Sequence, residues 1–238
     1  MRLPPPIAVL ALAWCGACGG GGDAAGADAL AAAVGRLAQG DQVGPCHATL
    51  IGPDRALTAA HCVVDLRTWR PSSQPPNGIR LRVVVGNRAF PVLDAVVPEE
   101  RALSPSGEIL DLRHDWTVLR VAVEEGAAPP PFLPLAGERA ARLAFVLAEA
   151  VIEVGIRPAE DGRGTTVDQA RCRIDAIEPG GGLLGYRCDG GTGPGASGSP
   201  LLRQTGDGGY EVIGVVSARA RSGPAGEVGF VVIPPTGD

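Results

Sequence analysis

Short apolar runs separated by Gly, Pro and Asp residues follow one another along most of the chain. Residues 80–83 read Arg, Leu, Arg, Val, and this alternation of polar and apolar positions is typical of a half-buried β-strand. Runs this short, rich in Val, Ile and Leu and bounded by turn residues, predict strands. We therefore expect strands at residues 47–51, 55–58, 79–85, 90–97, 117–123, 151–156, 172–177, 183–188, 200–203, 210–217 and 230–233.

The predicted strands fall into two groups, separated by a proline-rich stretch. Residues 124–134 contain four prolines and are typical of a linker. Eleven or twelve short strands in two groups predict an all-β protein with two antiparallel barrels. We therefore divide the chain into an N-terminal barrel at residues 41–125, an inter-barrel linker at 126–135 and a C-terminal barrel at 136–238. Residues 135–150 are ambiguous, because they are rich in Ala and carry apolar residues at helical spacing.

The first 40 residues carry no pattern that could bury a core, and they resemble a leader followed by a low-complexity tether. Met1-Arg2 and the apolar residues 7–14 are typical of a signal peptide, although this run is far shorter than the roughly 20 residues that span a bilayer. Small residues before Cys18 and glycines after it resemble a bacterial lipoprotein site, and cleavage by signal peptidase near residues 25–27 is the alternative. Both predict an extracytoplasmic protein, whether secreted, periplasmic or attached to a membrane by a lipid on Cys18.

Composition narrows the fold and the class of partner. The 35 Gly and 22 Pro disfavour long helices, and the net charge of −5 without a basic block argues against nucleic acid as a partner. Beyond Cys15 and Cys18 the chain has four cysteines, which permit three disulfide pairings: Cys46, Cys62, Cys172 and Cys188.

Three side chains with the chemistry of a hydrolase occur in the order His61, Asp115, Ser197. A serine hydroxyl needs an adjacent base, imidazole titrates near neutral pH, and a carboxylate on the second ring nitrogen fixes the tautomer of that base. This order matches one of the three common serine-hydrolase architectures, and no histidine follows Ser197 as an α/β-hydrolase would require. Gly195 and Gly198 permit a turn that aims the N–H groups of Gly195 and Ser197 at one point, which forms an oxyanion hole.

The motifs around these residues are similar to those of the trypsin-like serine peptidases. The Gly-x-Ser-Gly-Ser-Pro form around Ser197 resembles the bacterial glutamyl-endopeptidase branch of that family. The resemblance implies a chymotrypsin-like fold of two six-stranded barrels with the active site between them. It also implies that a monomer hydrolyses polypeptides through an acyl-enzyme intermediate, without a cofactor or metal. A catalytically silent binding protein of the same fold is the alternative. The matching segments are residues 46–51, 57–62, 115–119, 195–201 and 213–217.

The resemblance also implies a disulfide between Cys46 and Cys62, which ties the histidine loop to the preceding strand and leaves Cys172 to pair with Cys188. Each bridge is expected to stabilise the fold by about 3 kcal/mol and to persist only in an oxidising compartment. Cys46 and Cys62 with their neighbouring histidines also have the ligand types of a zinc site, but not its usual spacing.

Substrate selection is implied by positions in the family motif. Gly191 stands where cleavage after Arg or Lys needs an acid, and Thr192 matches the glutamyl-specific relatives, but Val216 replaces their histidine. Arg219 either favours acidic side chains of the substrate or is a solvated surface arginine. We therefore expect a preference for a neutral side chain that is small to medium and apolar. The full set of expected substrate-binding residues is Gly191, Thr192, Val216, Ser217, Ala218, Arg219 and Gly229.

Overall fold

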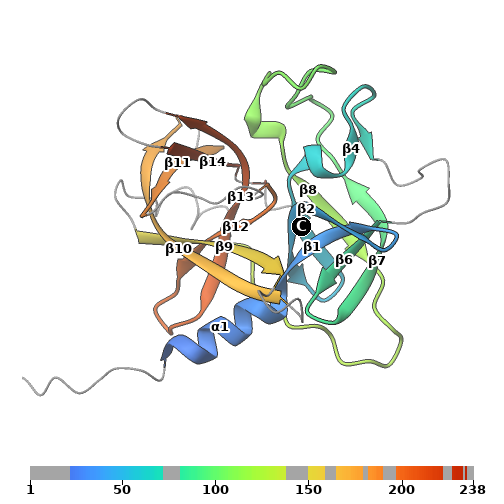
Figure 1. Cartoon of the computed structure of the whole chain (residues 1–238), viewed down its shortest axis with the longest axis vertical. Helices are drawn as coiled ribbons and strands as arrows, with labels where there is room; N and C mark the ends of the chain where they lie inside the picture. The colour runs from blue at the N-terminus through green and yellow to red at the C-terminus, as the bar shows by residue number, and fades with distance from the viewer. Residues whose placement is uncertain are drawn as a thin grey trace, which may run out of the picture.

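The strands of the computed structural model close into two antiparallel barrels of six strands each (Figure 1). The structure describes residues 22–71, 81–137, 150–158, 165–178, 182–189, 197–221, 227–232 and 234. Because each set of strands closes on itself, neither barrel leaves an unpaired sheet edge. The predicted all-β double barrel is therefore confirmed.

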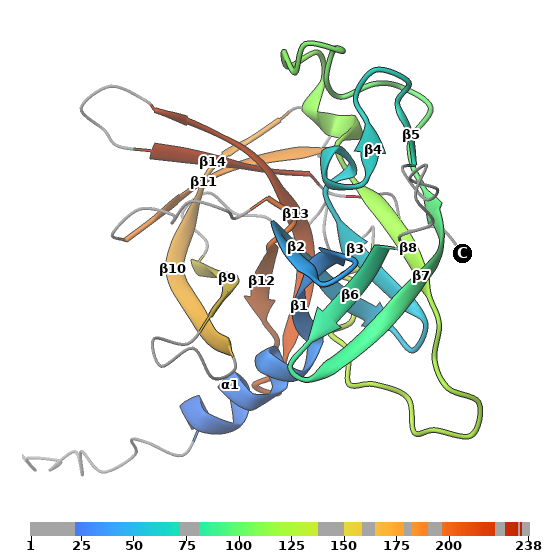
Figure 2. The same ribbon diagram turned by 45° about the vertical axis from the view of Figure 1, so that its right-hand side comes forward.

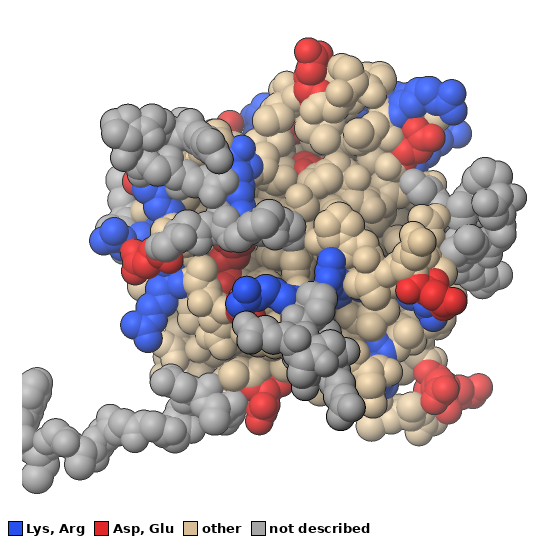
Figure 3. Space-filling view, in the orientation of Figure 1, with Lys and Arg blue, Asp and Glu red and all other residues tan. Residues whose placement is uncertain are grey.

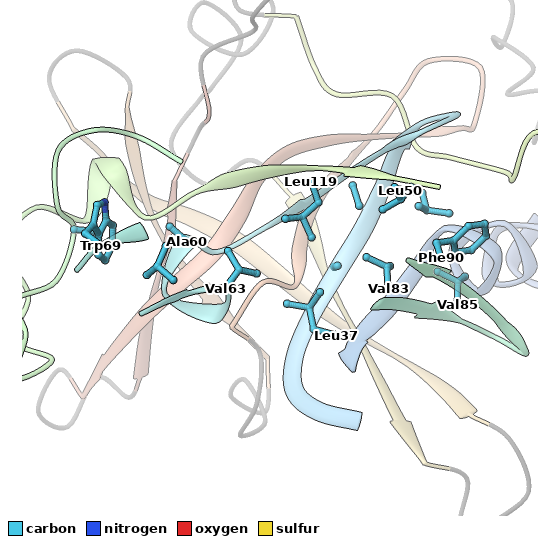
Figure 4. Close-up of a cluster of buried hydrophobic side chains, with 14 residues drawn as sticks. Leu37, Leu50, Ala60, Val63, Trp69, Val83, Val85, Phe90 and Leu119 are labelled. Carbon is cyan, nitrogen blue, oxygen red and sulfur yellow. The ribbon is translucent and has the colours of Figure 1, made fainter. Parts of the chain in front are cut away.

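The first barrel uses strands from the N-terminal half of the chain. Its strand order is β1 (Val34–Gln39), β2 (Gln42–Gly52), β3 (Arg55–Thr58), β8 (Thr117–Val121), β7 (Arg88–Val96) and β6 (Leu81–Val85). The short strands β4 (Val64–Asp65) and β5 (Arg70–Pro71) form a separate pair, and two 3-10 turns occur, η1 (Ala60–Cys62) and η2 (Leu112–His114). Figure 4 shows the inward side chains that form its core, among them Leu37, Leu50, Val83, Phe90 and Leu119.

The second barrel uses the remaining six strands. Its strand order is β10 (Thr165–Ile177), β11 (Leu183–Cys188), β14 (Glu227–Val232), β13 (Tyr210–Arg221), β12 (Pro200–Gln204) and β9 (Ala150–Pro158). Its core is mostly aliphatic, with Ile174, Leu184, Leu201 and Ile213 buried, but it also contains the fully buried Tyr186. A buried tyrosine needs a partner for its hydroxyl, and that partner lies in the site described below.

Residues 22–40 correct the prediction that the first 40 residues are leader and tether and that the first barrel begins at 41. Residues Gly22–Ala33 form helix α1, which contacts strands of both barrels along their lower edge in Figures 1 and 2, and β1 pairs with β2 and β6. The sequence hides both elements because they are rich in Ala and Gly. Leu30 is fully buried by tertiary packing, and Gly35 must lack a side chain because a Cβ there would overlap the Val84 carbonyl.

The chain between the barrels runs across their junction. Leu133 N–H donates to the Leu50 carbonyl in the first barrel, and Ala136 N–H donates to the Val212 carbonyl in the second. A third apolar cluster fills the junction, with contributions from α1 and both barrels: Leu30, Val34, Leu57, Val154, Leu202 and Val215. The two barrels therefore share packed contacts. Most of the ambiguous segment 135–150 lies outside the described residues.

Each barrel contains one disulfide, and both match the expected pairing. Cys46 of β2 bonds to Cys62 of η1, and Cys172 of β10 bonds to Cys188 of β11, which lies opposite it in the sheet. Within the part of the chain that the structure describes, no helix has the length and apolar character needed to cross a membrane. On the face in Figure 3, arginines and acidic residues are interspersed, so neither sign of charge forms a continuous patch there.

Candidate active site

His61 lies in the turn that follows the buried strand β3. Thr58, Ala59 and Ala60 are fully buried and lead directly into η1, and the disulfide at Cys62 ties this turn back to β2. The His61 side chain keeps 22% of its surface exposed, so one edge of the ring faces solvent. The buried segment Thr58-Ala59-Ala60 and the disulfide at Cys62 thus fix the backbone that carries the imidazole.

Asp115 lies directly opposite His61, at the end of η2 and before β8. Its side chain is 1% exposed, and both of its oxygens accept hydrogen bonds from His61: Oδ1 from the backbone N–H at 2.8 Å and Oδ2 from Nδ1 at 2.7 Å. Because an ionised carboxylate can only accept, the Nδ1 atom carries a proton in this arrangement. In neutral imidazole the other nitrogen, Nε2, is then unprotonated and can accept a proton.

The third donor to this carboxylate is Ser217 of β13, whose hydroxyl donates to Asp115 Oδ2. The register of β13 against β14 shifts between Val216 and Ala218, so Ser217 occupies a bulge and points away from the regular pairing. Ser217 was expected only among the substrate-binding residues, and its contact with Asp115 was not foreseen. A hydroxyl directly after the apolar run of residues 212–216 is the signal that could have found it.

Ser197 lies in a turn that is hydrogen-bonded to both barrels. Its carbonyl accepts from His47 N–H of β2 at 2.8 Å, while Gly198 N–H donates to the Val216 carbonyl of β13 at 2.8 Å. Gly198 has φ +81°, and a Cβ there would overlap the His47 carbonyl and the Thr58 hydroxyl. Only glycine therefore lets the serine turn approach β2 and β3 so closely. Thr58, the residue of β3 that the turn approaches, lies three residues before His61.

Several expected site residues lie outside the described part of the chain. They are the oxyanion-hole residue Gly195, the substrate-binding residues Gly191 and Thr192, and the lipidation candidate Cys18. The remaining substrate-binding residues lie on two adjacent strands, with Arg219 of β13 opposite Gly229 of β14 and Ala218 opposite Phe230.

Arg219 is not a solvated surface arginine, because its guanidinium donates to Glu153 Oε1 of β9 at 2.7 Å, and the side chains are 14% and 7% exposed. The second carboxylate oxygen, Oε2, accepts from the Tyr186 hydroxyl at 2.8 Å. Burial, and then the negative charge of Glu153, raise the pKa of Tyr186 well above its usual value, so this hydroxyl remains a donor. The sequence analysis missed Glu153 and Tyr186. An acid within the apolar run Val151-Ile152-Glu153-Val154 was the available signal.

A zinc site at the histidine loop is not supported by the donor atoms. Cys46, His61 and Cys62 bring their ligand atoms together, but the two sulfurs are bonded to each other and offer no thiolate.

The comparisons with known proteins point to one fold and one family. The chain is similar in structure to the Rv3671c protease in an inactive form, with 22% identity, a TM-score of 0.51, and coverage of 89% of this chain and 86% of that one. It is also similar to the thermostable serine protease AL20 from an extremophilic microorganism, at 15% identity and a TM-score of 0.55, covering 86% of this chain and 92% of that one. A third similar structure is kallikrein-related peptidase 10 in complex with Zn²⁺, at 17% identity and a TM-score of 0.56, covering 85% and 89%.

No curated protein sequence matches the chain significantly. At these identities the structural matches show the shared fold, and they do not show the glutamyl-endopeptidase branch. The family model for the trypsin-like peptidase domain matches residues 46–215, a range that includes His61, Asp115 and Ser197. Because this match covers more than half of the chain, the protein belongs to the family that carries a trypsin-like peptidase domain.

Proposed function

We propose that this protein is a serine endopeptidase that hydrolyses peptide bonds through His61, Asp115 and Ser197. The observation that carries the proposal is the His61–Asp115 pair, in which a buried carboxylate accepts from Nδ1 at 2.7 Å and so directs Nε2 away from itself. The turn of Ser197 is bonded to the same part of β2 that the histidine loop is tied to. Family membership supports polypeptides as the substrates.

In the proposed acylation step the Ser197 hydroxyl oxygen attacks the scissile carbonyl carbon, and its proton moves to His61 Nε2. Asp115 stabilises the imidazolium that forms. The oxyanion accepts from the N–H groups of Gly195 and Ser197, where one such donor is typically worth about 2.7–4 kcal/mol in the transition state. The carbon–nitrogen bond then breaks, and the amine departs with the proton from His61.

In the proposed deacylation step water attacks the ester on Ser197, and His61 removes a proton from that water. Collapse of the second tetrahedral intermediate breaks the bond to Ser197 Oγ, which takes the proton back from His61. The products are a free carboxylic acid and the starting enzyme, so the cycle needs no cofactor or metal.

A fluorophosphonate probe tests this proposal, because it reacts with an activated serine. We expect labelling of the wild type, loss of labelling in Ser197→Ala, and retained labelling in the control Ser199→Ala. Ser199 is a matched control since it is a fully buried serine in the same turn. A wild type that is not labelled, or a Ser197→Ala variant that is, would overturn the proposal; the first result would favour a catalytically silent binding protein.

We further propose that the protein acts outside the cytoplasm as a monomer, without nucleic acid as a partner. The leader-like residues at the N-terminus and the two disulfides support export. Cleavage before a lipidated Cys18 leaves all of α1, whereas cleavage near residues 25–27 removes its first turn, up to Gly26, where an added Cβ would lie 3.4 Å from the Tyr210 ring. The packing of α1 therefore favours Cys18. Incorporation of an alkyne fatty acid by the wild type, and not by Cys18→Ser, tests this.

A further inference from the structure

Three of the six strands of the second barrel meet at one carboxylate, that of Glu153 in β9, and a fourth strand packs against the tyrosine that bonds to it. The carboxylate is bonded to Arg219 of β13 at 2.7 Å and to the hydroxyl of Tyr186 of β11 at 2.8 Å. The Tyr186 ring lies on Gly229 of β14 so closely that a Cβ there would overlap it. These residues, Glu153, Tyr186, Arg219 and Gly229, are called the barrel charge cluster below.

Strand β13 connects the barrel charge cluster to the turn that carries the proposed nucleophile. Strand β13 is bonded to the serine turn at Val216, reaches Asp115 through Ser217, and carries Arg219 two residues further on. At the rise of a strand, Arg219 is about 7 Å along β13 from Ser217. For a substrate whose carbonyl lies at Ser197, β13 is therefore a strand that leads from the nucleophile to Arg219.

The charges of the cluster compensate each other. The guanidinium of Arg219 supplies a positive charge, and the Tyr186 hydroxyl remains a donor because its pKa is raised. Glu153 thus faces one cation and one neutral donor. Both charged side chains retain a little solvent exposure, so a substrate charge nearby would sense both of them.

We propose that Glu153 and Arg219 set the substrate preference of the proposed peptidase by masking each other's charge. The preference concerns the residue that supplies the scissile carbonyl, here called the acyl-side residue. An acidic acyl-side chain that is drawn to Arg219 is repelled by Glu153, and a basic one that is drawn to Glu153 is repelled by Arg219. The Tyr186 ring, which occupies the space over Gly229, limits the size of the side chain that fits. The enzyme therefore cleaves after small, uncharged residues.

This inference rests on the proposed function, and single substitutions test it because they unmask opposite charges. Glu153→Gln keeps the shape of the side chain and removes its negative charge, so kcat/KM for a peptide with an acyl-side Glu should rise roughly tenfold relative to one with Ala. Arg219→Gln should raise the ratio for an acyl-side Arg by a similar factor. The double variant should return to the wild-type preference for uncharged residues.

The experiment measures kcat/KM of the full-length protein for four peptides that differ only in an acyl-side Ala, Gln, Glu or Arg. Ratios to the Ala peptide cancel any general loss of active enzyme. Glu211→Gln is the matched control, since Glu211 pairs with Arg203 at similar burial near the opposite end of β13. If a thermal melt shows that one single variant is not folded, the other still tests the inference, because it should raise the kcat/KM ratio for the peptide of opposite charge.

The outcomes separate this inference from the proposed function. The inference alone is overturned if the wild type is labelled by the fluorophosphonate and cleaves the Ala peptide, while the kcat/KM ratios of the single variants change no more than those of Glu211→Gln. Cleavage that persists in Ser197→Ala, or a wild type that neither labels nor cleaves, overturns both. Opposite shifts in the two single variants support the masking of charge.

Discussion

Two buried carboxylates of this protein each accept from one basic side chain and one hydroxyl, but they differ in the chemistry that they can support. Asp115 accepts from an imidazole and a serine hydroxyl, and Glu153 accepts from a guanidinium and a tyrosine hydroxyl. Imidazole exchanges its proton near neutral pH, whereas guanidinium does not. The first pair can therefore take part in proton transfer, while the second can only present a fixed and compensated charge.

The difference arises from the partner and not from the carboxylate. Asp115 belongs to the first barrel and reaches the second through Ser217, so it lies at the junction where Ser197 is also held. Glu153 lies inside the second barrel, where its side-chain partners come from β11 and β13. Burial makes both carboxylates dependent on their donors, because an ionised group in the interior must be paired.

The largest expected effect comes from Asp115→Asn. The amide has the shape of the carboxylate, but its NH₂ group can donate to His61 Nδ1 and so favour the wrong tautomer of the base. We expect kcat to fall by about 10⁴ with the fold intact. Glu153→Gln should change hydrolysis of a peptide with an acyl-side Ala by far less. Steady-state kinetics with that peptide measure both.

Asp111→Asn is the control for Asp115→Asn. Asp111 is four residues earlier and its carboxylate accepts from Arg113. Its loss should leave kcat nearly unchanged. Equal losses in Asp111→Asn and Asp115→Asn would contradict the assignment of Asp115.

The hydroxyl donors to the two carboxylates should separate activity from stability. A hydrogen bond to a charged group contributes about 1.5–3 kcal/mol. Ser217→Ala should therefore lower kcat roughly tenfold, because it weakens the orientation of the base through Asp115. Tyr186→Phe should lower the free energy of unfolding by about 1.5–3 kcal/mol in urea titrations, with a smaller effect on kcat. The reverse pattern would mean that the roles of the two carboxylates are exchanged.

The smallest expected effect is a dependence of stability on alkaline pH. Below pH about 10 Tyr186 is protonated in both the folded and the unfolded chain, so it does not make the free energy of unfolding depend on pH. Above that pH the unfolded chain loses the proton first, since burial and Glu153 raise the pKa of Tyr186 in the folded state. The free energy of unfolding should then fall by up to about 1.4 kcal/mol per pH unit.

Tyr186→Phe should remove this alkaline slope, and Tyr210→Phe should keep it. The chain contains no lysine and these two tyrosines alone, so few other groups titrate in this range. An unchanged slope in Tyr186→Phe, measured by urea unfolding between pH 9 and 11, would show that the Tyr186 phenol is not responsible.

The run of short strands predicted two antiparallel barrels, because strand formation depends on local pattern, whereas the pairing of the cysteines was implied by the family resemblance. Eleven of the twelve barrel strands were expected, and the remaining one, β1, was assigned to the tether. Its sequence Val34-Gly35-Arg36-Leu37-Ala38-Gln39 has little local strand preference and is stabilised by pairing with two neighbours. The local pattern of polar and apolar residues does not predict pairing of this kind.

The site was predicted less completely than the fold. His61 and Asp115 meet as expected, since each lies beside a recognisable buried strand. Glu153 and Tyr186 were missed because their significance depends on four strands that meet in space, while along the chain each is a single polar residue among apolar ones. Arg219 was recognised as relevant, but its partner lies 66 residues away.

The most direct test of the proposed mechanism is a crystal structure of the wild type after reaction with the fluorophosphonate. We expect phosphorus bonded to Ser197 Oγ, His61 Nε2 within hydrogen-bonding distance of the adduct, and Nδ1 still bonded to Asp115. An adduct on another residue, or a Ser197 adduct with the His61 ring turned away from it, would contradict the assignment of nucleophile and base.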